Sequence, residues 1–578
     1  MSRICSVPIS FLVFRGQGIK LTSYVAKKCR ERETLMPDLP RGSGDDGYEG
    51  AIVLPPKCSM YIDNPVACVD YASLYPSSMI SENLSHDSKV WTKEYNLDGK
   101  LIKITGERDA AGNFIYDNLP DYQYVDVEYD VFAYRRPAPN ARAVKTKCGS
   151  MICRWAQFPG GQKGIMPSIL EELLRARADT RKLAKTVADP FMQNILDKRQ
   201  LGYKVTANSL YGQCGARTST FYEKDIAAST TATGRKMITY AKRIIEEVYG
   251  DRICPLDAGG EVRTRAEYVY GDTDSVFFTY NLEDPQTGAP IRGKRALEIT
   301  IEIAQQTAQL CTHFLKSPME LAYEKTLMPF ILLSKKRYVG MLYETNPNKG
   351  KMKYMGLSLK RRDSCDYLKD TYGNIIKMLM SGENVTTTID YLNRAMSDLV
   401  DGRVPIDKLI LTRSLRSDYK NPNQIAHKVL ADRIGKRDPG NKPKSGERLK
   451  FAFIVNSDPR SLLGERIETP EYIAENRLKI DYNYYITNQL MKPLQQLYGL
   501  AIEQIHIERG RSETALRSYR REIQKLNREY KDLEVFMKKR EIYCSKQIKE
   551  MLFDAILKRI QNERARNTLI TSFYCKKT

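Results

Sequence analysis

Two short aspartate motifs that lie far apart in the sequence constrain the fold of this 578-residue chain most strongly. Asp70 ends the apolar, β-prone run 66–69, whereas Asp272 and Asp274 lie between two runs of the same kind. Carboxylates at the ends of buried strands are costly unless something pairs with them, and Mg²⁺ held by carboxylates and substrate phosphates is the usual arrangement for phosphoryl transfer. The motifs therefore predict a metal-binding site. The alternative is an aspartate that caps a turn and an unrelated hairpin aspartate.

The charge balance indicates a polyanionic partner. Lys and Arg total 92 against 70 Asp and Glu, which gives a net charge of +22. An excess of this size favours nucleic acid as the partner. The 12 cysteines include no C-x-x-C unit and there are only four histidines, which argues against a zinc module or a disulfide framework. Cys148 and Cys153, the closest pair, are expected to be structural thiols.

The apolar stretch at residues 7–14 is not predicted to cross a membrane. Pro8 interrupts it and Arg15 ends it, so it is too short for a span, and it lacks a convincing cleavage site. We expect an intracellular protein without a recognisable targeting signal.

Several segments have clear secondary-structure patterns. Residues 92–147 resemble a strand-rich insertion with Gly and Asn turns. Residues 164–167 open a long helical pattern that Asp189-Pro190 breaks, and a second helix runs to about residue 212, so the two form an antiparallel pair. A further helix is expected from about Ala227, and residues 501–578 are charge-rich and predicted to be mostly helical.

The second predicted helix carries a possible phosphate site. Lys204, Asn208 and Tyr211 share one face because they are spaced i, i+4 and i+7. Arg177 lies on the first helix and could point into the same gap, where Arg and Lys would clamp a triphosphate. A solvated helix face with one buried Tyr is the alternative, and this helix alone does not decide between them.

Taken together, these motifs resemble the polymerase half of family B DNA polymerases, in the delta-like replicative branch and especially in large DNA viruses. The matching segments are motif A (70–77), motif B (204–212), the Thr231, Gly234 and Arg235 segment, motif C (270–275), the lysine-rich palm motif (334–338) and the thumb segments 427–448 and 481–493. The resemblance covers about residues 45–495, and the correct order of several motifs makes it specific.

The resemblance implies an α+β fold shaped as a right hand, with an antiparallel-sheet palm, two-helix fingers and a mixed thumb, plus a helical C-terminal extension. The implied parts are a connector to an absent exonuclease region (1–60), the first palm part (61–163, with an insertion at about 92–147), the fingers (164–212), the second palm part (213–345), the thumb (346–500) and the extension (501–578).

The resemblance also implies DNA-templated addition of deoxynucleotides to a primer 3′ end in DNA replication, by phosphoryl transfer with two Mg²⁺ ions. The catalytic residues would be Asp70, Asp272 and Asp274. Of these, Asp70 and Asp274 would bind the metals, and carbonyls of Tyr71 or its neighbours would complete the metal shell. Asp272 would assist without being a constant direct ligand. The expected location is the nucleus or a viral replication compartment.

Nucleotide and DNA contacts follow from the same resemblance. Tyr75 would lie under the sugar and clash with a 2′-hydroxyl, and Tyr211 would pack against the nascent base pair. The implied nucleotide-binding residues are Ser73, Leu74, Tyr75, Arg177, Lys204, Asn208 and Tyr211. The implied DNA-binding residues are Tyr48, Gly50, Gly212, Lys335, Lys336, Arg337, Tyr338, Lys436 and Arg437. The basic residues would contact primer–template phosphates regardless of sequence.

Two features depart from the family pattern. Nothing before residue 60 supplies the paired-carboxylate motif of the proofreading domain, so we expect the back half of a longer protein, or one piece of a split enzyme whose exonuclease lies on another chain. Only Cys544 and Cys575 lie near the C-terminus, so no cysteine-rich metal module is expected.

Two other functions remain as alternatives. A catalytically inactive relative that binds DNA or organises partners would have lost a metal or triphosphate residue, yet all of these are present. A protein-primed polymerase would carry an insertion between motifs A and B, as residues 92–147 do by position. The end of that insertion, residues 149–154, instead resembles the viral delta-like branch.

The C-terminal tail resembles the peptide by which replication proteins dock on PCNA-type sliding clamps. In residues 567–574, Ile570, Phe573 and Tyr574 would share one face of a 3₁₀ turn and enter a hydrophobic pocket. Docking of the same side chains on the preceding helix is the alternative.

Overall fold

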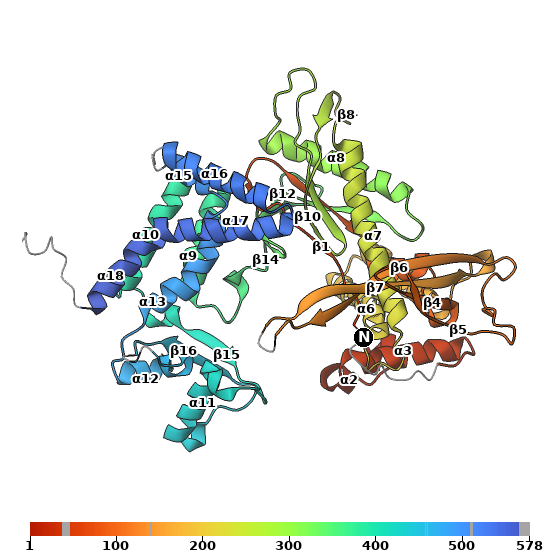
Figure 1. Ribbon diagram of the computed structural model, residues 1–578, viewed down its shortest axis with the longest axis horizontal. Helices are drawn as coiled ribbons and strands as arrows, with labels where there is room; N and C mark the ends of the chain where they lie inside the picture. Colours follow the sequence, from red (N-terminus) through yellow and green to blue (C-terminus); the bar gives the residue numbers. More distant parts are fainter. Residues whose placement is uncertain (37–46, 139–140, 457, 459, 509–512, 566–578) are drawn as a thin grey trace, which may run out of the picture. The chain divides into compact units, whose positions relative to one another are not determined.

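The computed structural model describes residues 1–36, 47–138, 141–456, 458, 460–508 and 513–565 (Figure 1). The chain divides into two compact units, and each is described by itself. The first combines Met1–Leu54 with Val66–Thr326, and the second combines Pro55–Pro65 with Leu327–Thr578. The fold is mixed, with helices and antiparallel sheets in both units, which confirms the predicted α+β class.

The first unit begins with helices that the sequence patterns did not predict. They are α1 (Ser2–Cys5), α2 (Ile9–Phe14) and α3 (Gln17–Glu31). Leu21, Tyr24, Val25 and Cys29 recur at helical spacing on α3 and are buried. These side chains join the hydrophobic core that α3 shares with α5 and α6.

The predicted helical pair is confirmed as α5 (Ile165–Thr186) and α6 (Pro190–Cys214), which pack against each other. Asp189 caps α6, because its carboxylate accepts hydrogen bonds from the main-chain N–H groups of Phe191 and Met192. Pro190 occupies the first helical position, where its missing N–H is harmless. Thus the Asp-Pro pair that ends the first pattern also starts the second helix.

The strand-rich insertion forms a four-stranded antiparallel sheet in the order β5-β4-β7-β6. Its strands are β4 (Lys89–Asn96), β5 (Leu101–Gly106), β6 (Gln123–Arg135) and β7 (Val144–Gln157). The next helix, α7 (Lys224–Tyr249), starts slightly earlier than predicted and packs on β6. In Figure 1, α7 runs from this sheet to α8 (Gly293–His313).

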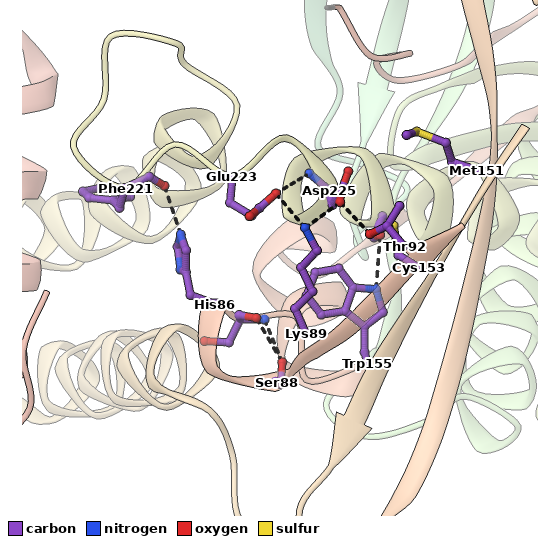
Figure 2. A network of polar contacts seen from close by, with 12 residues as sticks. His86, Ser88, Lys89, Thr92, Met151, Cys153, Trp155, Phe221, Glu223 and Asp225 are labelled. Carbon is purple, nitrogen blue, oxygen red and sulfur yellow. Dashed lines mark hydrogen bonds and ion pairs between the residues drawn. The ribbon is translucent and has the colours of Figure 1, made fainter. Parts of the chain in front are cut away.

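A buried ion pair joins the insertion sheet to α7, as Figure 2 shows. Lys89 Nζ on β4 lies 2.7 Å from Asp225 Oδ2, and the hydroxyls of Thr92 and Tyr129 donate hydrogen bonds of 2.7 and 2.9 Å to the same carboxylate. Burial alone would raise the pKa of Asp225, but Lys89 and the two hydroxyls hold it below its usual value. Glu223 is a second partner of Lys89, at 3.2 Å. The sheet therefore fixes where α7 begins.

The candidate site lies on an antiparallel sheet in the first unit. Its strands follow the order β1 (Val53–Leu54), β10 (Glu267–Asp272), β11 (Ser275–Thr279) and β3 (Val66–Tyr71). Helices α7 and α8 contribute Ile238, Ile245, Ile299 and Ile303 to the core beneath these strands. A short pair, β8 (Arg252–Pro255) and β9 (Glu261–Thr264), lies outside this sheet. β12 (Leu321–Ser334) begins in this unit and ends in the second.

The second unit contains antiparallel strands and a largely helical core. β2 (Ser59–Tyr61) pairs with the end of β12, and β13 (Arg337–Tyr343) pairs with β14 (Lys351–Met355). A three-stranded sheet contains β15 (Leu411–Ser414), β16 (Arg448–Phe453) and β17 (Ile467–Glu468). The helices before residue 500 are α9 (Asp366–Met380), α10 (Val385–Val400), α11 (Ala426–Arg437), α12 (Pro470–Glu475), α13 (Tyr482–Tyr484), the π-helix Tyr485–Leu490 and α14 (Met491–Tyr498).

The described part of residues 501–578 is helical, as its pattern predicts. It contains α15 (Ile502–Glu508), α16 (Glu513–Glu529), α17 (Leu533–Ile548), a π-helical turn (Lys549–Phe553) and α18 (Asp554–Arg564). Tyr519, Cys544 and Phe553 are buried in the same core as α9, α10 and α14. These helices are therefore packed into the second unit.

Two further predictions concern thiols and membranes. Throughout the described residues the cysteines carry free thiols, and burial raises the pKa of Cys153 to about 12. No helix in the described ranges is both long and apolar enough to cross a bilayer.

Candidate active site

Strand register brings the two aspartate motifs together. Asp70, near the end of β3, lies opposite Ser275, and Asp272 pairs with the same serine across the β10–β11 hairpin. Asp274 lies in the hairpin turn, where its carbonyl accepts a 2.9 Å hydrogen bond from the Tyr71 N–H. Residues that are far apart in the sequence therefore meet where β3, β10 and β11 end or turn, as the metal-site prediction requires.

The backbone is unusual at both motifs. Thr273 has a φ of 61° and Ser73 has a φ of 53°, although neither is glycine. Such a conformation is rare for a β-branched residue and persists only where the surroundings impose it, often at functional sites. The Thr273 N–H donates to the Ile52 carbonyl at 3.1 Å, which helps to hold the turn. Ser73 is the N-cap residue of α4 (Leu74–Ser81).

The carboxylates form a strongly acidic centre. Burial, followed by the charges of Asp274 and Glu324, raises the pKa of Asp70 to about 7. Burial also raises the pKa of Asp274, with contributions from Asp272 and Glu324. Lys204 opposes both shifts. The nearby lysines therefore compensate this charge only in part, which suits a site that binds a cation.

The donor groups fit a magnesium site that substrate phosphates complete. No group of three or more His, Cys, Asp or Glu side chains that could hold a metal occurs in the described residues. Asp70 and Asp274 are instead two carboxylates, and Mg²⁺ typically takes only one or two from the protein. Tyr71 can offer only its main-chain carbonyl, because its hydroxyl is buried and donates to the Met237 carbonyl at 2.8 Å.

Asp272 has a different environment from the other two aspartates. Its carboxylate accepts hydrogen bonds from the Tyr270 hydroxyl at 3.1 Å and from the Thr273 hydroxyl at 3.2 Å. These contacts stabilise the hairpin turn. They are consistent with the expected assisting role, since part of the carboxylate's hydrogen-bonding capacity is already used.

The helical pair places its cations near the same turn. Arg177 on α5 donates from Nη1 to the Ser73 hydroxyl at 3.4 Å and from Nε to Gln200 at 3.2 Å. Lys204 and Asn208 are exposed on α6, and Lys204 is close enough to Asp70 and Asp274 to affect their pKa values. The structure thus brings Lys204 to the acidic centre and Arg177 to the adjacent Ser73, from the two predicted helices.

Three tyrosines pack together close to the acidic centre. The rings of Tyr75 and Tyr211 pack with their centroids 4.4 Å apart, and the hydroxyls of Tyr211 and Tyr48 are 3.3 Å apart. Burial and the nearby Asp274 raise the pKa of Tyr75 to about 12. The resemblance implied separate roles for Tyr75 and Tyr211, whereas their rings are in contact.

Residues on α7 support these tyrosines and the chain around Glu49. Thr231, Gly234 and Arg235 match the family pattern, but the sequence did not indicate what they do. The Thr231 hydroxyl donates to the Glu49 carbonyl at 2.7 Å, and Arg235 Nη1 donates to the Glu49 and Gly50 carbonyls at 3.0 and 2.9 Å. At Gly234 a Cβ atom would lie 3.1 Å from the Tyr75 ring, so only glycine leaves full space for this ring. Glu324 was also missed, because nothing in its local sequence indicates an acidic neighbour.

The basic residues of the lysine-rich motif lie in the second unit. Lys335 and Lys336 form the turn between β12 and β13, and Arg337 begins β13. Tyr338 is buried, with its ring in edge contact with Phe330. Tyr338, which is predicted to contact DNA, therefore exposes little of its side chain.

The remaining residues predicted to bind DNA differ in their exposure and in the contacts they make. Lys436 is exposed near the end of α11, whereas Arg437 forms an ion pair with Glu468 at 2.7 Å and lies over the Tyr472 ring. Gly212 is exposed on α6. Ile570, Phe573 and Tyr574 lie outside the described residues, as does Cys575.

The family model and the relatives that match this chain and are described next are all DNA polymerases. The family described as DNA polymerase family B matches residues 7–500. The DNA polymerase of Pyramimonas orientalis virus is 41% identical across 99% of this chain and 48% of its own length. The DNA polymerase of Phaeocystis pouchetii virus is 60% identical across 57% of this chain and 31% of its own length. The DNA polymerase delta catalytic subunit of Candida albicans is 30% identical across 86% of this chain and 42% of its own length.

The chain thus spans about half or less of the length of these relatives. A similar fold occurs in the solved family B DNA polymerase of the archaeon Pyrobaculum calidifontis, with a TM-score of 0.52 and 21% identity. That match covers 86% of this chain and 52% of the other.

Proposed function

This chain belongs to DNA polymerase family B, and on that premise we propose that it is the polymerase module of a DNA-templated DNA polymerase. In this proposal it adds deoxynucleotides to the 3′ end of an annealed primer during DNA replication. The observation that carries the proposal is the register of β3, β10 and β11, which brings Asp70 beside Asp274. Arg177 reaches the Ser73 hydroxyl, close after Asp70 in the chain, and Lys204 is near enough to Asp70 and Asp274 to lower their pKa values.

The proposed metal ligands are Asp70, Asp274 and the main-chain carbonyl of Tyr71. Two Mg²⁺ ions would supply electrostatic stabilisation of the attacking and leaving oxygens. Asp272 keeps the hairpin turn in place through Tyr270 and Thr273, so that Asp274 stays beside β3. The partly uncompensated acidic charge of the centre supports this assignment.

The proposed nucleotide site lies between these aspartates and the helical pair. Arg177, Lys204 and Asn208 would bind the triphosphate, with the guanidinium held by Gln200 and the Ser73 hydroxyl. Ser73 and Leu74 would approach it at the start of α4. Tyr75, restrained by Tyr211 and Gly234, would exclude a 2′-hydroxyl by steric clash.

We propose the right-hand division of the family for this chain. Residues 61–163 and 213–345 would be the palm with its insertion, 164–212 the fingers, 346–500 the thumb and 501–578 a helical extension. The proposed primer–template contacts are Tyr48, Gly50, Gly212, Lys335, Lys336, Arg337, Tyr338, Lys436 and Arg437. The net charge of +22 supports a DNA partner.

The wider setting is also proposed from the relatives. We propose that an exonuclease is supplied by another segment or chain. A PCNA-type sliding clamp would bind Ile570, Phe573 and Tyr574. The enzyme would act in the nucleus or in a viral replication compartment. A catalytically inactive, DNA-binding relative is the alternative function. The intact set of Asp70, Asp274, Arg177 and Lys204 argues against it.

Primer extension on an ordinary annealed DNA primer tests the proposal. With Mg²⁺ and the four deoxynucleotides, we expect products whose sequence is complementary to the template. Extension that needs a protein primer would favour a protein-primed enzyme. A chain that binds the primer–template and adds nothing to it would favour the inactive relative.

A further inference from the structure

We infer that α17, in the extension beyond the matched family region, positions Arg337 for contact with primer–template phosphates through Gln496 and Glu541. The inference rests on the proposed function, because it concerns how the lysine-rich turn holds DNA. Gln496 and Glu541 are positioning residues in this account, since both act through Arg337. Every contact involved lies within the second unit.

The turn that carries these cations has a conformation imposed by its surroundings. Lys336 has a φ of 62°, which is uncommon for a residue other than glycine. Gly356, at the end of β14, lies so close that a Cβ atom there would be 2.1 Å from the Lys336 carbonyl oxygen. Backbone strain of this kind persists only where neighbouring groups hold it, so the neighbours of the turn matter.

A chain of hydrogen bonds leads from the turn to α17. Arg337 Nη1 donates to Gln496 Oε1 at 2.6 Å, and Gln496 Nε2 donates to Glu541 Oε1 at 3.1 Å. The amide of Gln496 has only one orientation that satisfies both neighbours, because its oxygen must face the cation and its nitrogen the carboxylate. Glu541, with weaker help from the Leu333 carbonyl at 3.5 Å from the same nitrogen, therefore fixes which end of Gln496 is presented to Arg337.

Further contacts hold α17 beside the turn. Gln495 Nε2 donates to the Ser545 carbonyl at 2.8 Å, and Lys335 Nζ lies 2.9 Å from Glu534 Oε1. A cavity of about 340 Å³ remains, with Leu333, Gln496 and Cys544 among its lining residues. Apolar packing between α17, α14 and the end of β12 is thus incomplete, so polar contacts contribute to holding α17 beside the turn.

Arg337 lines a cationic hollow that suits a phosphate backbone. The hollow has a volume of about 560 Å³, and Arg361, Arg413 and Lys492 also line it. Asp363 lies in the same lining and pairs with Arg361 at 2.9 Å and with Arg413 at 2.6 Å, so Arg337 and Lys492 supply most of the uncompensated positive charge. Glu541 is one of its lining residues as well. An arginine held in one orientation makes directed contacts to phosphate, whereas a freely rotating one contributes mainly net charge.

A double-mutant cycle on primer–template affinity tests the inference in the full chain. Glu541→Ala should weaken binding by about three- to ten-fold, the range expected for a partly exposed hydrogen bond to a charged group. Glu541→Gln keeps an acceptor for Gln496 Nε2 and should restore most of the affinity. In the Arg337→Ala background, Glu541→Ala should have no further effect, because the group that it positions is gone. Glu529→Ala, at an exposed glutamate on α16, is the matched control and should bind like the wild type.

The outcomes separate this inference from the proposed function. Equal losses from Glu541→Ala in the wild-type and Arg337→Ala backgrounds would show that α17 acts independently of Arg337, and would overturn the inference. A Glu541→Gln variant as weak as Glu541→Ala would overturn it too. If these results came with normal primer extension by the wild type, the proposed function would stand. A wild-type chain that neither binds nor extends primer–template would overturn both.

Discussion

At the scale of single residues, the candidate site depends on side chains that are held by neighbours from other elements. Tyr75 is packed against Tyr211 and faces Gly234, and Arg177 is held by Gln200 and Ser73. A polar or aromatic group restrained in this way can discriminate between substrates by shape, because it cannot move aside without losing its own contacts.

Tyr75→Ala should increase the incorporation of ribonucleotides relative to deoxynucleotides by about ten-fold or more, since removal of the ring opens space for a 2′-hydroxyl. The measurement compares single-nucleotide addition with each nucleotide type. Tyr75→Phe is the control and should keep the wild-type ratio, because the ring remains. An unchanged ratio in Tyr75→Ala would mean that Tyr75 is only a packed core residue.

Asp70 should make the metal-free chain less stable as the pH rises. Its folded pKa of about 7 lies above its ordinary value of 3.8, so the folded state binds this proton more tightly than the unfolded state. Stability is then lost as the pH rises from about 4 through about 7. In a chelator, the melting temperature of the wild type should fall over this range relative to that of Asp70→Asn. Mg²⁺ should raise the wild-type melting temperature more at the upper end of the range than at the lower end.

Parallel melting curves for the wild type and Asp70→Asn across this pH range would contradict the charge arrangement. Asp63→Asn is a suitable control, because that carboxylate is exposed and lies outside the site. It should reproduce the wild-type dependence.

The aspartates and helix cations could be predicted from sequence because each motif is local, with its residue types and spacing readable in one segment. The support from α7 could not be predicted in the same way. Thr231 and Arg235 bind main-chain carbonyls of Glu49 and Gly50, and a carbonyl leaves no mark on the sequence. The close approach of Glu324 to Asp70 likewise depends on how β12 is placed beside β3.

At the scale of elements, the insertion sheet and α7 behave as one supporting structure. The buried pair of Lys89 and Asp225 joins them (Figure 2). Helix α7 then carries Gly234 to the Tyr75 ring and Arg235 to the Glu49 carbonyl. The Asp189-Pro190 break made the helical pair predictable. The helices before residue 32 were harder to predict, since short apolar runs there are interrupted by Pro8 and polar residues and gain stability mainly from packing on α5 and α6.

Asp225→Ala should destabilise the first unit by about 3–5 kcal/mol, because it leaves the Lys89 ammonium buried without its nearest partner. Glu223→Ala removes the second and more exposed partner of Lys89 together with the N-cap hydrogen bond that Glu223 accepts from the Asp225 N–H, and should cost only about 1–2 kcal/mol. Denaturant unfolding of the two variants checks the difference. Equal losses would show that the buried pair does not anchor α7.

At the scale of the whole molecule, charge and local chemistry have separate roles in this account. In the proposed function, the net charge of +22 and basic groups such as Lys335, Lys336 and Arg337 would bind the DNA backbone, whereas Asp70 and Asp274 would hold the metal ions for the chemical step. Charge-driven binding requires no metal at the active site. Loss of the aspartates should therefore abolish catalysis without abolishing DNA binding.

The most direct test is single-turnover addition of one correct deoxynucleotide by Asp70→Ala and Asp274→Ala, with primer–template affinity measured on the same samples. The account predicts that addition slows by on the order of a thousand-fold or more, while affinity stays within about two-fold of the wild type. Mg²⁺-dependent addition at a near wild-type rate in either variant would contradict the assignment of these aspartates and the proposed function built on them.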